Sequence, residues 1–176
     1  MTRDASKKLV NYQEWIKSVP VEITDDPLRT VEAYRLALFA SDVGWQDVSK
    51  LMRDRRTLSL SDQLYRAIGS EGGNIAEGYS RGTGKDRARF YEYALGSARE
   101  SRHWYYDGRH VLGETVTAHR LRLHAQIIRL LLTMIPDQRG HALQEDSFPY
   151  GAVESMDTAP LAKNELSELF ENVPLP

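Results

Sequence analysis

Between Leu28 and about Asp54, apolar and small side chains recur every three or four residues. The spacing alternates 3-4-3-4-3-4 along seven positions, which places these side chains on one face of a helix of about seven turns. A strand would not keep this spacing for so long, because its side chains alternate with a period of two. The sequence therefore predicts a long helix whose inward face consists of Val31, Tyr34, Leu38, Ser41, Trp45, Val48 and Met52.

A second helical pattern runs from about Leu60 to Tyr79, and Ser59 or Ser61 is its expected N-cap. Three glycines lie within residues 69–73, and together they cost a helix about 2–3 kcal/mol relative to alanine. A sequence keeps such residues where it needs a kink or close backbone approach. We therefore expect this helix to pack closely against a neighbouring helix. Its predicted inward positions are Leu60, Leu64, Ile68 and Ile75.

A third helix is predicted from about Gly84 to Leu112. Thr83 is its expected N-cap, with Asp86 three residues later as the partner in a capping box. Gly113 is expected to end it. Two apolar seams run along this helix, so it is expected to pack against more than one neighbour. One seam is Phe90, Ala94, Ser97, Ser101, Trp104, Gly108 and Val111, and the other is Tyr91, Leu95, Ala98, Tyr105 and Leu112.

A fourth helix is predicted from about Thr115 to Ile135, stopped by Pro136. Short connections between long helices imply antiparallel neighbours, and no alternating strand pattern is present. The predicted fold is all-α, an antiparallel up-down-up-down four-helix bundle with N- and C-terminal extensions. The predicted inward positions of the fourth helix are Val116, Leu123, Ile127, Leu130, Leu131 and Met134.

The chain divides into three predicted regions. Residues 1–27 form an N-terminal leader, in which Tyr12, Trp15 and Ile16 predict a short helical turn that docks on the bundle. Residues 28–136 form the bundle. Residues 137–176 form an acidic C-terminal tail, and apolar positions between 161 and 171 predict a short amphipathic helix that docks on the bundle or on a partner.

Charge is distributed unevenly along the chain. Residues 51–132 contain 14 Lys and Arg against 9 Asp and Glu, whereas residues 137–176 contain 2 against 8. One interpretation is that the basic middle has an anionic partner. The other is that the surplus forms an ordinary solvated helix surface.

The 176 residues include no cysteine, which excludes disulfides, thiolate metal sites and a cysteine nucleophile. No apolar run of 18 or more residues is present, so we expect no membrane span. The first residues lack the apolar run of a signal peptide. We expect the protein to be cytoplasmic.

No residue pattern points to a catalytic or cofactor site. Residues 82–86 resemble a phosphate-binding loop only superficially, because Tyr79 stands where that motif needs its first glycine and Asp86 replaces its hydroxyl residue. His103 and Asp107 share a helical face but provide only two of the three or four ligands that zinc needs. Asn74 and Glu77 also share a face, and we interpret them as a structural polar pair, with Glu77 held by a hydrogen bond or an arginine. We therefore predict no catalytic residues, no metal and no cofactor.

Basic residues form two clusters, which are the candidate nucleic-acid-binding residues because cations bind phosphates by charge. In an up-down bundle they lie at opposite ends, one after the first helix and one at the start of the third. The helix N-terminus adds partial positive charge to the second cluster. The first cluster is Arg53, Arg55 and Arg56, and the second is Arg81, Lys85, Arg87 and Arg89.

Two segments carry a family resemblance. Residues 74–82 read Asn-Ile-Ala-Glu-Gly-Tyr-Ser-Arg-Gly, and residues 90–100 begin Phe-Tyr-Glu-Tyr-Ala-Leu-Gly-Ser-Ala. Together with the Gln-Leu-Tyr-Arg-Ala run at 63–67, they resemble the four-helix-bundle family of 23S ribosomal-RNA intervening-sequence proteins over about residues 30–135. Asn74, Glu77 and Gly78 fall in the motif that closes the second helix in that family.

The resemblance implies an up-down bundle that assembles into a homopentamer and for which no enzymatic activity is established. Proteins of this family are encoded within insertions in bacterial 23S ribosomal RNA genes or elsewhere in the genome. A related branch comprises the accessory proteins of diversity-generating retroelements, which bind a reverse transcriptase and nucleic acid.

We therefore expect a non-enzymatic oligomeric scaffold or adaptor for RNA, another nucleic acid or an RNA-processing partner such as a reverse transcriptase. The alternative is a protein–protein interaction module whose arginines form inter-subunit ion pairs. A third alternative is an enzyme with a site at a subunit interface.

Overall fold

The structure is a computed structural model that describes residues 11–139 and 169–176. These residues are helical and contain no strand, so the predicted all-α class is confirmed. The helices are α1 (Tyr12–Ser18), α2 (Val21–Thr24), η1 (Pro27–Thr30), α3 (Glu32–Leu51), η2 (Arg55–Thr57), α4 (Leu58–Tyr79), α5 (Gly84–Asp107), α6 (Arg109–Leu112) and α7 (Glu114–Arg139).

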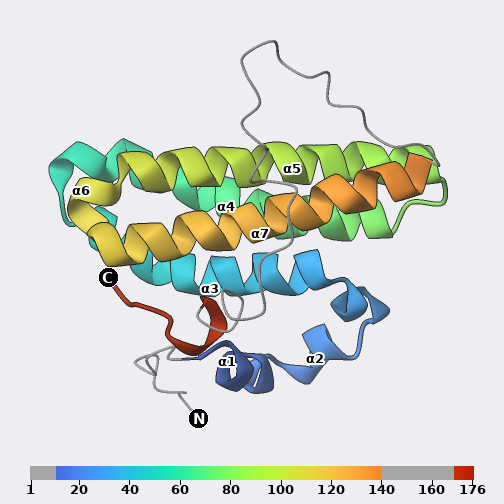
Figure 1. Cartoon of the computed structure of the whole chain (residues 1–176), viewed down its shortest axis with the longest axis horizontal. Coiled ribbons are helices and arrows are strands. Elements are labelled where there is room, and N and C mark those ends of the chain that lie inside the picture. Colours follow the sequence, from blue (N-terminus) through green and yellow to red (C-terminus); the bar gives the residue numbers. More distant parts are fainter. Residues whose placement is uncertain (1–10, 140–168) are drawn as a thin grey trace, which may run out of the picture.

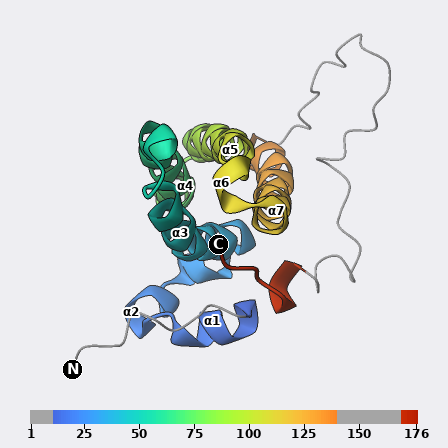
Figure 2. The same ribbon diagram turned by 90° about the vertical axis from the view of Figure 1, so that its left-hand side faces the viewer.

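Four long helices, α3, α4, α5 and α7, lie side by side (Figure 1). Helix α3 contacts α4 and α7, and α5 contacts the same two helices, so the four surround a common centre (Figure 2). The colour sequence in Figure 1 changes direction from each long helix to the next. Because the connections are short, the turn after α3 and the turn after α4 lie at opposite ends of the bundle (Figure 1).

The inward positions predicted for the later helices are largely correct. On α7, Leu130 and Met134 are half-buried and the other predicted positions are buried. The helix predicted to reach Leu112 is divided at Gly108 into α5 and α6; along the two, the second predicted seam is entirely in the core, whereas the first alternates between buried and half-buried positions. Core positions that were predicted correctly include Leu64, Ile68, Ile75, Tyr91, Leu95, Ala98, Tyr105, Leu112, Val116, Leu123, Ile127 and Leu131.

The inward face predicted for α3 is wrong. Trp45 and Met52 are each 58 % exposed, and of the seven predicted positions only Val48 is buried. Alanine, glycine, aliphatic residues and one carboxylate face the centre instead, so the large side chains Trp45 and Met52 did not mark the core. The side of α3 that faces the other long helices includes Leu36, Ala37, Ala40, Val43, Gly44, Asp47 and Leu51.

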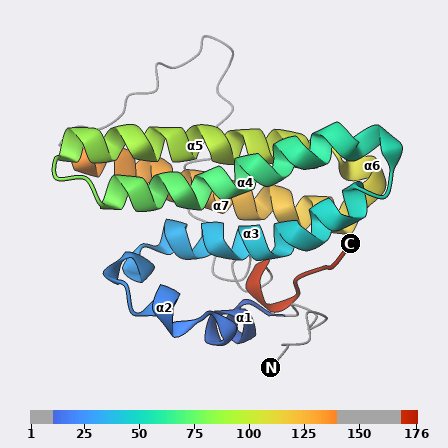
Figure 3. The same ribbon diagram turned by 180° about the vertical axis from the view of Figure 1, so that it is seen from behind.

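Helix α3 has apolar residues on two sides because a second layer covers part of it. Helices α1 and α2 lie along α3 on the side away from the bundle, together with the C-terminal segment (residues 169–176) (Figure 3). Tyr34 and Leu38 line a cavity beneath this layer. The predicted stripe on α3 is thus half-buried along the first half of the helix, whereas in the second half Trp45 and Met52 are exposed and Val48 is buried.

The predicted helical turn near the N-terminus is α1. Tyr12 and Trp15 are buried, and both rings pack edge-on against Phe39 at centroid distances of 5.1 and 5.0 Å. The Trp15 indole Nε1 donates a hydrogen bond to Asp42 at 2.5 Å. The C-terminal segment joins this cluster through Phe170, whose ring lies 4.8 Å from that of Tyr12. Most of the predicted tail helix lies outside the described residues, but 169–171 are helical.

Helix boundaries follow the local signals in some places and depart from them in others. The Thr83 hydroxyl accepts a hydrogen bond from the Asp86 amide at 3.1 Å, and Gly113 ends α6 with φ of +91°, as predicted. Helix α4 begins before Ser59, and Thr57 at its N-cap makes no side-chain capping bond. Helix α7 continues three residues past Pro136, because a proline near the end of a helix removes one backbone hydrogen bond without breaking the preceding turns. None of the helices in 11–139 and 169–171 is long and apolar enough to cross a membrane.

The expected close packing at Gly69, Gly72 and Gly73 is not found among the described residues. A Cβ added at Gly69 or Gly73 would meet nothing within 4 Å, and one at Gly72 would make only an ordinary contact with Ala37 at 3.7 Å. The close approach is at Gly78 instead, where a Cβ would lie 2.7 Å from the Tyr91 ring. Glycine is therefore required where α4 meets α5.

Two glycine-to-alanine variants test this difference. Gly78→Ala should lower the free energy of unfolding by about 1–3 kcal/mol, because the new methyl group overlaps the Tyr91 ring. Gly96→Ala, at an open position on α5, should raise it by about 0.5–1 kcal/mol through helix propensity alone. Urea unfolding followed by far-UV circular dichroism measures both. Equal effects of the two substitutions would contradict the packing at Gly78.

Candidate functional site

Charged side chains lie buried at the centre of the bundle. Asp47 on α3 and Arg120 on α7 form a bidentate ion pair, with Nε–Oδ2 and Nη2–Oδ1 distances of 2.7 and 3.1 Å, and both side chains are 0 % exposed. The Tyr105 hydroxyl on α5 donates a further hydrogen bond to Asp47 Oδ2 at 2.8 Å. Burial, and next the negative charge of Asp47, raise the pKa of Tyr105 well above its ordinary value, so the phenol remains a donor.

The rest of the Arg120 guanidinium contacts His119 and the C-terminal segment. Nη1 lies 2.7 Å from His119 Nδ1, and Nη2 donates to the Pro174 carbonyl at 2.9 Å. Because a guanidinium can only donate, His119 Nδ1 is the acceptor. His119 Nε2 therefore carries the ring proton and donates it to the Leu169 carbonyl at 2.9 Å. Burial, and secondly the positive charge of Arg120, lower the pKa of His119 from 6.5 to about 4.

A second buried cluster joins the other helices. Glu71 on α4 accepts a hydrogen bond from the Ser101 hydroxyl on α5 at 2.5 Å, and its Oε1 lies 3.1 Å from Nδ1 of His124 on α7. The His124 ring packs against Tyr105 at a centroid distance of 5.3 Å, which connects the two clusters. Together the clusters contact all four long helices.

These clusters are arranged to hold the bundle together. In the second cluster the serine hydroxyl contacts the carboxylate, whereas a nucleophilic serine needs to contact the imidazole. The charged, histidine, tyrosine and serine side chains of both clusters are buried. Among the described residues, no three histidine, aspartate or glutamate side chains converge as metal ligands would.

Sequence reasoning missed both clusters, although a signal was present. Asp47 follows Val43 by four residues and precedes Leu51 by four, which places it on their face of α3. Arg120 and His124 occupy the same kind of position on α7. A charged residue at an inward helical position predicts a buried partner.

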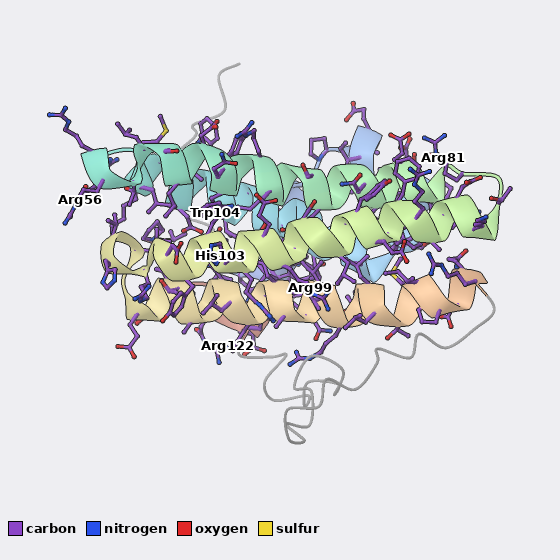
Figure 4. All side chains as sticks on the ribbon, turned by 90° about the horizontal axis from the view of Figure 1, so that it is seen from above. Arg56, Arg81, Arg99, His103, Trp104 and Arg122 are labelled. Atoms are coloured by element: carbon purple, nitrogen blue, oxygen red, sulfur yellow. The ribbon has the colours of Figure 1, made fainter. Side chains whose placement is uncertain are left out.

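The two predicted basic clusters lie at opposite ends of the bundle, where Figure 4 shows Arg56 and Arg81. Arg53, Arg55 and Arg56 are all exposed in the connection after α3. Arg56 contacts Asp54 through Nε and Nη2, at 2.9 and 2.5 Å. Hydrogen bonds from Arg56 lower the pKa of Asp54 from 3.8 to about 2.

Three of the four basic residues in the other cluster make contacts within the chain. Arg81 pairs with Glu77 and stacks on the Phe90 ring, 4.4 Å from its centroid. Arg87 donates to the Gln138 side chain at 2.9 Å and to the Arg81 carbonyl at 3.0 Å. Arg89 donates a hydrogen bond to the Tyr93 hydroxyl at 2.7 Å. Lys85, the fourth basic residue of this cluster, is exposed.

The motif residues Asn74, Glu77 and Gly78 shape the joint between α4 and α5. The predicted pairing of Asn74 with Glu77 is wrong, because the Asn74 amide donates to the Ser70 carbonyl at 2.9 Å. The prediction that an arginine holds Glu77 is confirmed by its ion pair with Arg81. The predicted pairing of His103 with Asp107 is also present, at 3.5 Å on the surface. The motif therefore supplies packing and capping at a helix joint.

Several large apolar side chains are exposed on the outside of α3 and α4. Trp45 and Tyr65 are exposed and contact each other edge-on, with ring centroids 5.8 Å apart. The open positions Gly69 and Gly73 follow Tyr65 at four-residue intervals and so lie on its side of α4. Contiguous exposed apolar surface on a folded protein marks an interaction site. We call this surface the α3–α4 outer face, and it consists of Trp45, Met52, Leu58, Tyr65, Gly69 and Gly73.

The fold and the enclosed polar centre define a helical-bundle protein whose buried polar residues are structural. The family model described as 23S rRNA-intervening sequence protein matches residues 29–131. The chain belongs to this family, which confirms the resemblance carried by residues 74–82. No curated protein and no solved structure matches the chain.

The buried state of His119 predicts a specific pH dependence. His119 binds a proton near pH 6.5 in the unfolded chain but only near pH 4 in the folded chain. Its contribution to the free energy of unfolding is therefore complete above pH 6.5 and is lost as the pH falls toward 4. The full shift corresponds to about 3 kcal/mol. Urea unfolding at several pH values should show a shallower fall for His119→Gln than for the wild type.

The matched control is His103→Gln, which changes an exposed histidine and should leave the wild-type dependence intact. Identical slopes for His119→Gln and the wild type would show that His119 is not held neutral by burial.

Proposed function

We propose that the protein is a non-enzymatic scaffold or adaptor that assembles into a homo-oligomer through the α3–α4 outer face. The observation that supports this most directly is the exposed contact between Trp45 and Tyr65 beside two open glycines. Tryptophan and tyrosine are enriched at the centres of protein interfaces, where they contribute much of the binding energy.

The glycines favour a helix as the partner element. Each glycine inside a helix costs about 1 kcal/mol relative to alanine, and no contact with the described residues offsets this cost at Gly69 or Gly73. A helix of a second copy can approach the α4 backbone closely at these positions. The family resemblance implies five copies, and we adopt the homopentamer as the proposed assembly. The proposal includes a cytoplasmic location.

The non-enzymatic part of the proposal is supported by the burial of the polar centre. The side chains that resemble catalytic groups, such as Ser101, Glu71 and His124, are completely enclosed and hold helices together. The arginines at the bundle ends fit the protein–protein alternative as well, because Arg81 and Arg87 already serve as structural residues at the α4–α5 joint.

Light scattering coupled to size-exclusion chromatography tests the assembly. The wild type should elute as an oligomer, and Trp45→Ala/Tyr65→Ala should shift it to monomer, because the variant removes the aromatic centre of the interface. Both side chains are exposed, so circular dichroism should remain unchanged. The matched control is Tyr106→Ala, an exposed aromatic on α5, which should leave the oligomer intact. An unchanged mass for the double variant would rule out this face as the interface.

We propose binding of structured RNA or another nucleic acid at the two bundle ends as a second candidate function. Arg53 and Arg55 are exposed at one end, and Lys85 is exposed in the first turn of α5 at the other. The α5 N-terminus adds partial positive charge there. The scaffold would then bring an RNA-processing enzyme, such as a reverse transcriptase, together with its nucleic acid.

Filter binding of a structured RNA across a salt series tests this candidate. Affinity should fall as salt rises, because phosphate contacts release counterions. Arg53→Gln/Arg55→Gln and Lys85→Gln should each weaken binding. Each lost phosphate contact should also reduce the slope of the logarithm of the binding constant against the logarithm of the salt concentration by roughly one. Arg109→Gln is the control, since that guanidinium stacks on Tyr106. Absence of binding at low salt, or binding that these variants do not change, would eliminate this function.

A further inference from the structure

A cavity of about 610 Å³ lies between the N-terminal segment (residues 11–30) and the first half of α3. Its volume is in the range of about 300–1,000 Å³ that is typical of small-molecule sites. The α3–α4 outer face uses the second half of α3, so the two features are separate. The cavity is also separate from the buried clusters, whose side chains do not line it.

The apolar wall of the cavity is held in place by ring packing and by a hydrogen bond. Tyr12 packs between Phe39 and Phe170, with ring centroids 5.1 and 4.8 Å away. The Trp15 indole is fixed by its hydrogen bond to Asp42. The wall is therefore preformed, which lowers the entropic cost of binding a ligand.

The polar part of the cavity is mainly cationic. Among the described residues, Lys17, Arg29 and Arg35 line it against one carboxylate, Glu32. Nη1 of Arg29 donates to the Thr24 carbonyl at 2.8 Å, and Nη1 of Arg35 donates to the Arg29 carbonyl at 2.6 Å. Backbone carbonyls thus orient both guanidiniums without neutralising them, and neither forms an ion pair with a described carboxylate.

We propose that this cavity binds a small amphipathic anion, an aromatic or branched aliphatic carboxylate or sulfonate. Its acidic group contacts Arg29 and Arg35, since guanidiniums match the geometry of such groups and form charge-assisted hydrogen bonds with them. Its apolar body lies against Tyr12 and Trp15. A ligand-binding role of this kind goes beyond the proposed scaffold function and does not depend on it.

Fluorescence titration of the full chain with anilinonaphthalene sulfonate tests the proposal, because this probe combines an aromatic body with an anionic group. We expect saturable binding at one site per chain. Arg29→Gln and Arg35→Gln should each weaken it roughly tenfold, the equivalent of one lost charge-assisted hydrogen bond. Arg55→Gln, which removes an exposed cation elsewhere, is the matched control and should bind as the wild type does.

Two further measurements make the outcome decisive. Phenylnaphthylamine has a similar aromatic body without the sulfonate, so its affinity should not change in the arginine variants. Ile23→Trp, at a partly exposed lining position, should fill the cavity and abolish binding of both probes while circular dichroism stays unchanged.

Three results would overturn the proposal. The first is that no saturable binding of the sulfonate probe is found. The second is that its affinity is unchanged in both Arg29→Gln and Arg35→Gln. The third is that Ile23→Trp still binds the probes. The wild-type oligomer mass is measured independently, so failure here is distinguishable from failure of the scaffold proposal.

Discussion

The buried ion pair between Asp47 and Arg120 is the interaction on which the rest of the structure depends. Two charges removed from water are tolerated only when their mutual attraction is supplemented by further hydrogen bonds. Here Tyr105 donates to the carboxylate, while His119 and the Pro174 carbonyl accept from the guanidinium. Removing one partner of such a pair costs about 3–5 kcal/mol, because the other charge stays buried and unpaired. The pair therefore fixes how α3 and α7 align.

The second cluster extends the same constraint to the remaining helices. Glu71 on α4 is held by Ser101 on α5 and His124 on α7, and the His124 ring packs against Tyr105 of the first cluster. Apolar packing alone tolerates repacking and specifies a unique arrangement less sharply. A half-satisfied polar network would be penalised much more strongly. The polar centre thus selects one register of the bundle, and the C-terminal segment completes it.

The outside of α3 connects the structural and functional features. The family match covers residues 29–131, whereas α1, α2 and the C-terminal segment lie outside it. These outer elements cover the first half of the apolar stripe on α3 and form the cationic cavity. In the second half, Trp45 and Met52 stay exposed beside Tyr65. One stripe on one helix therefore supplies both the proposed self-association surface and a wall of the proposed anion site.

The sequence by itself determined the four long helices, the cap at Thr83 and the helix end at Gly113, because these depend on periodicity and on contacts a few residues apart. It also located both basic clusters at opposite ends. Only the tertiary structure decided which side of α3 faces the centre, since both sides are apolar. It likewise decided the partner of Asp47, which lies 73 positions away. A contact at that separation leaves no local pattern, so it is defined only once the helices have packed.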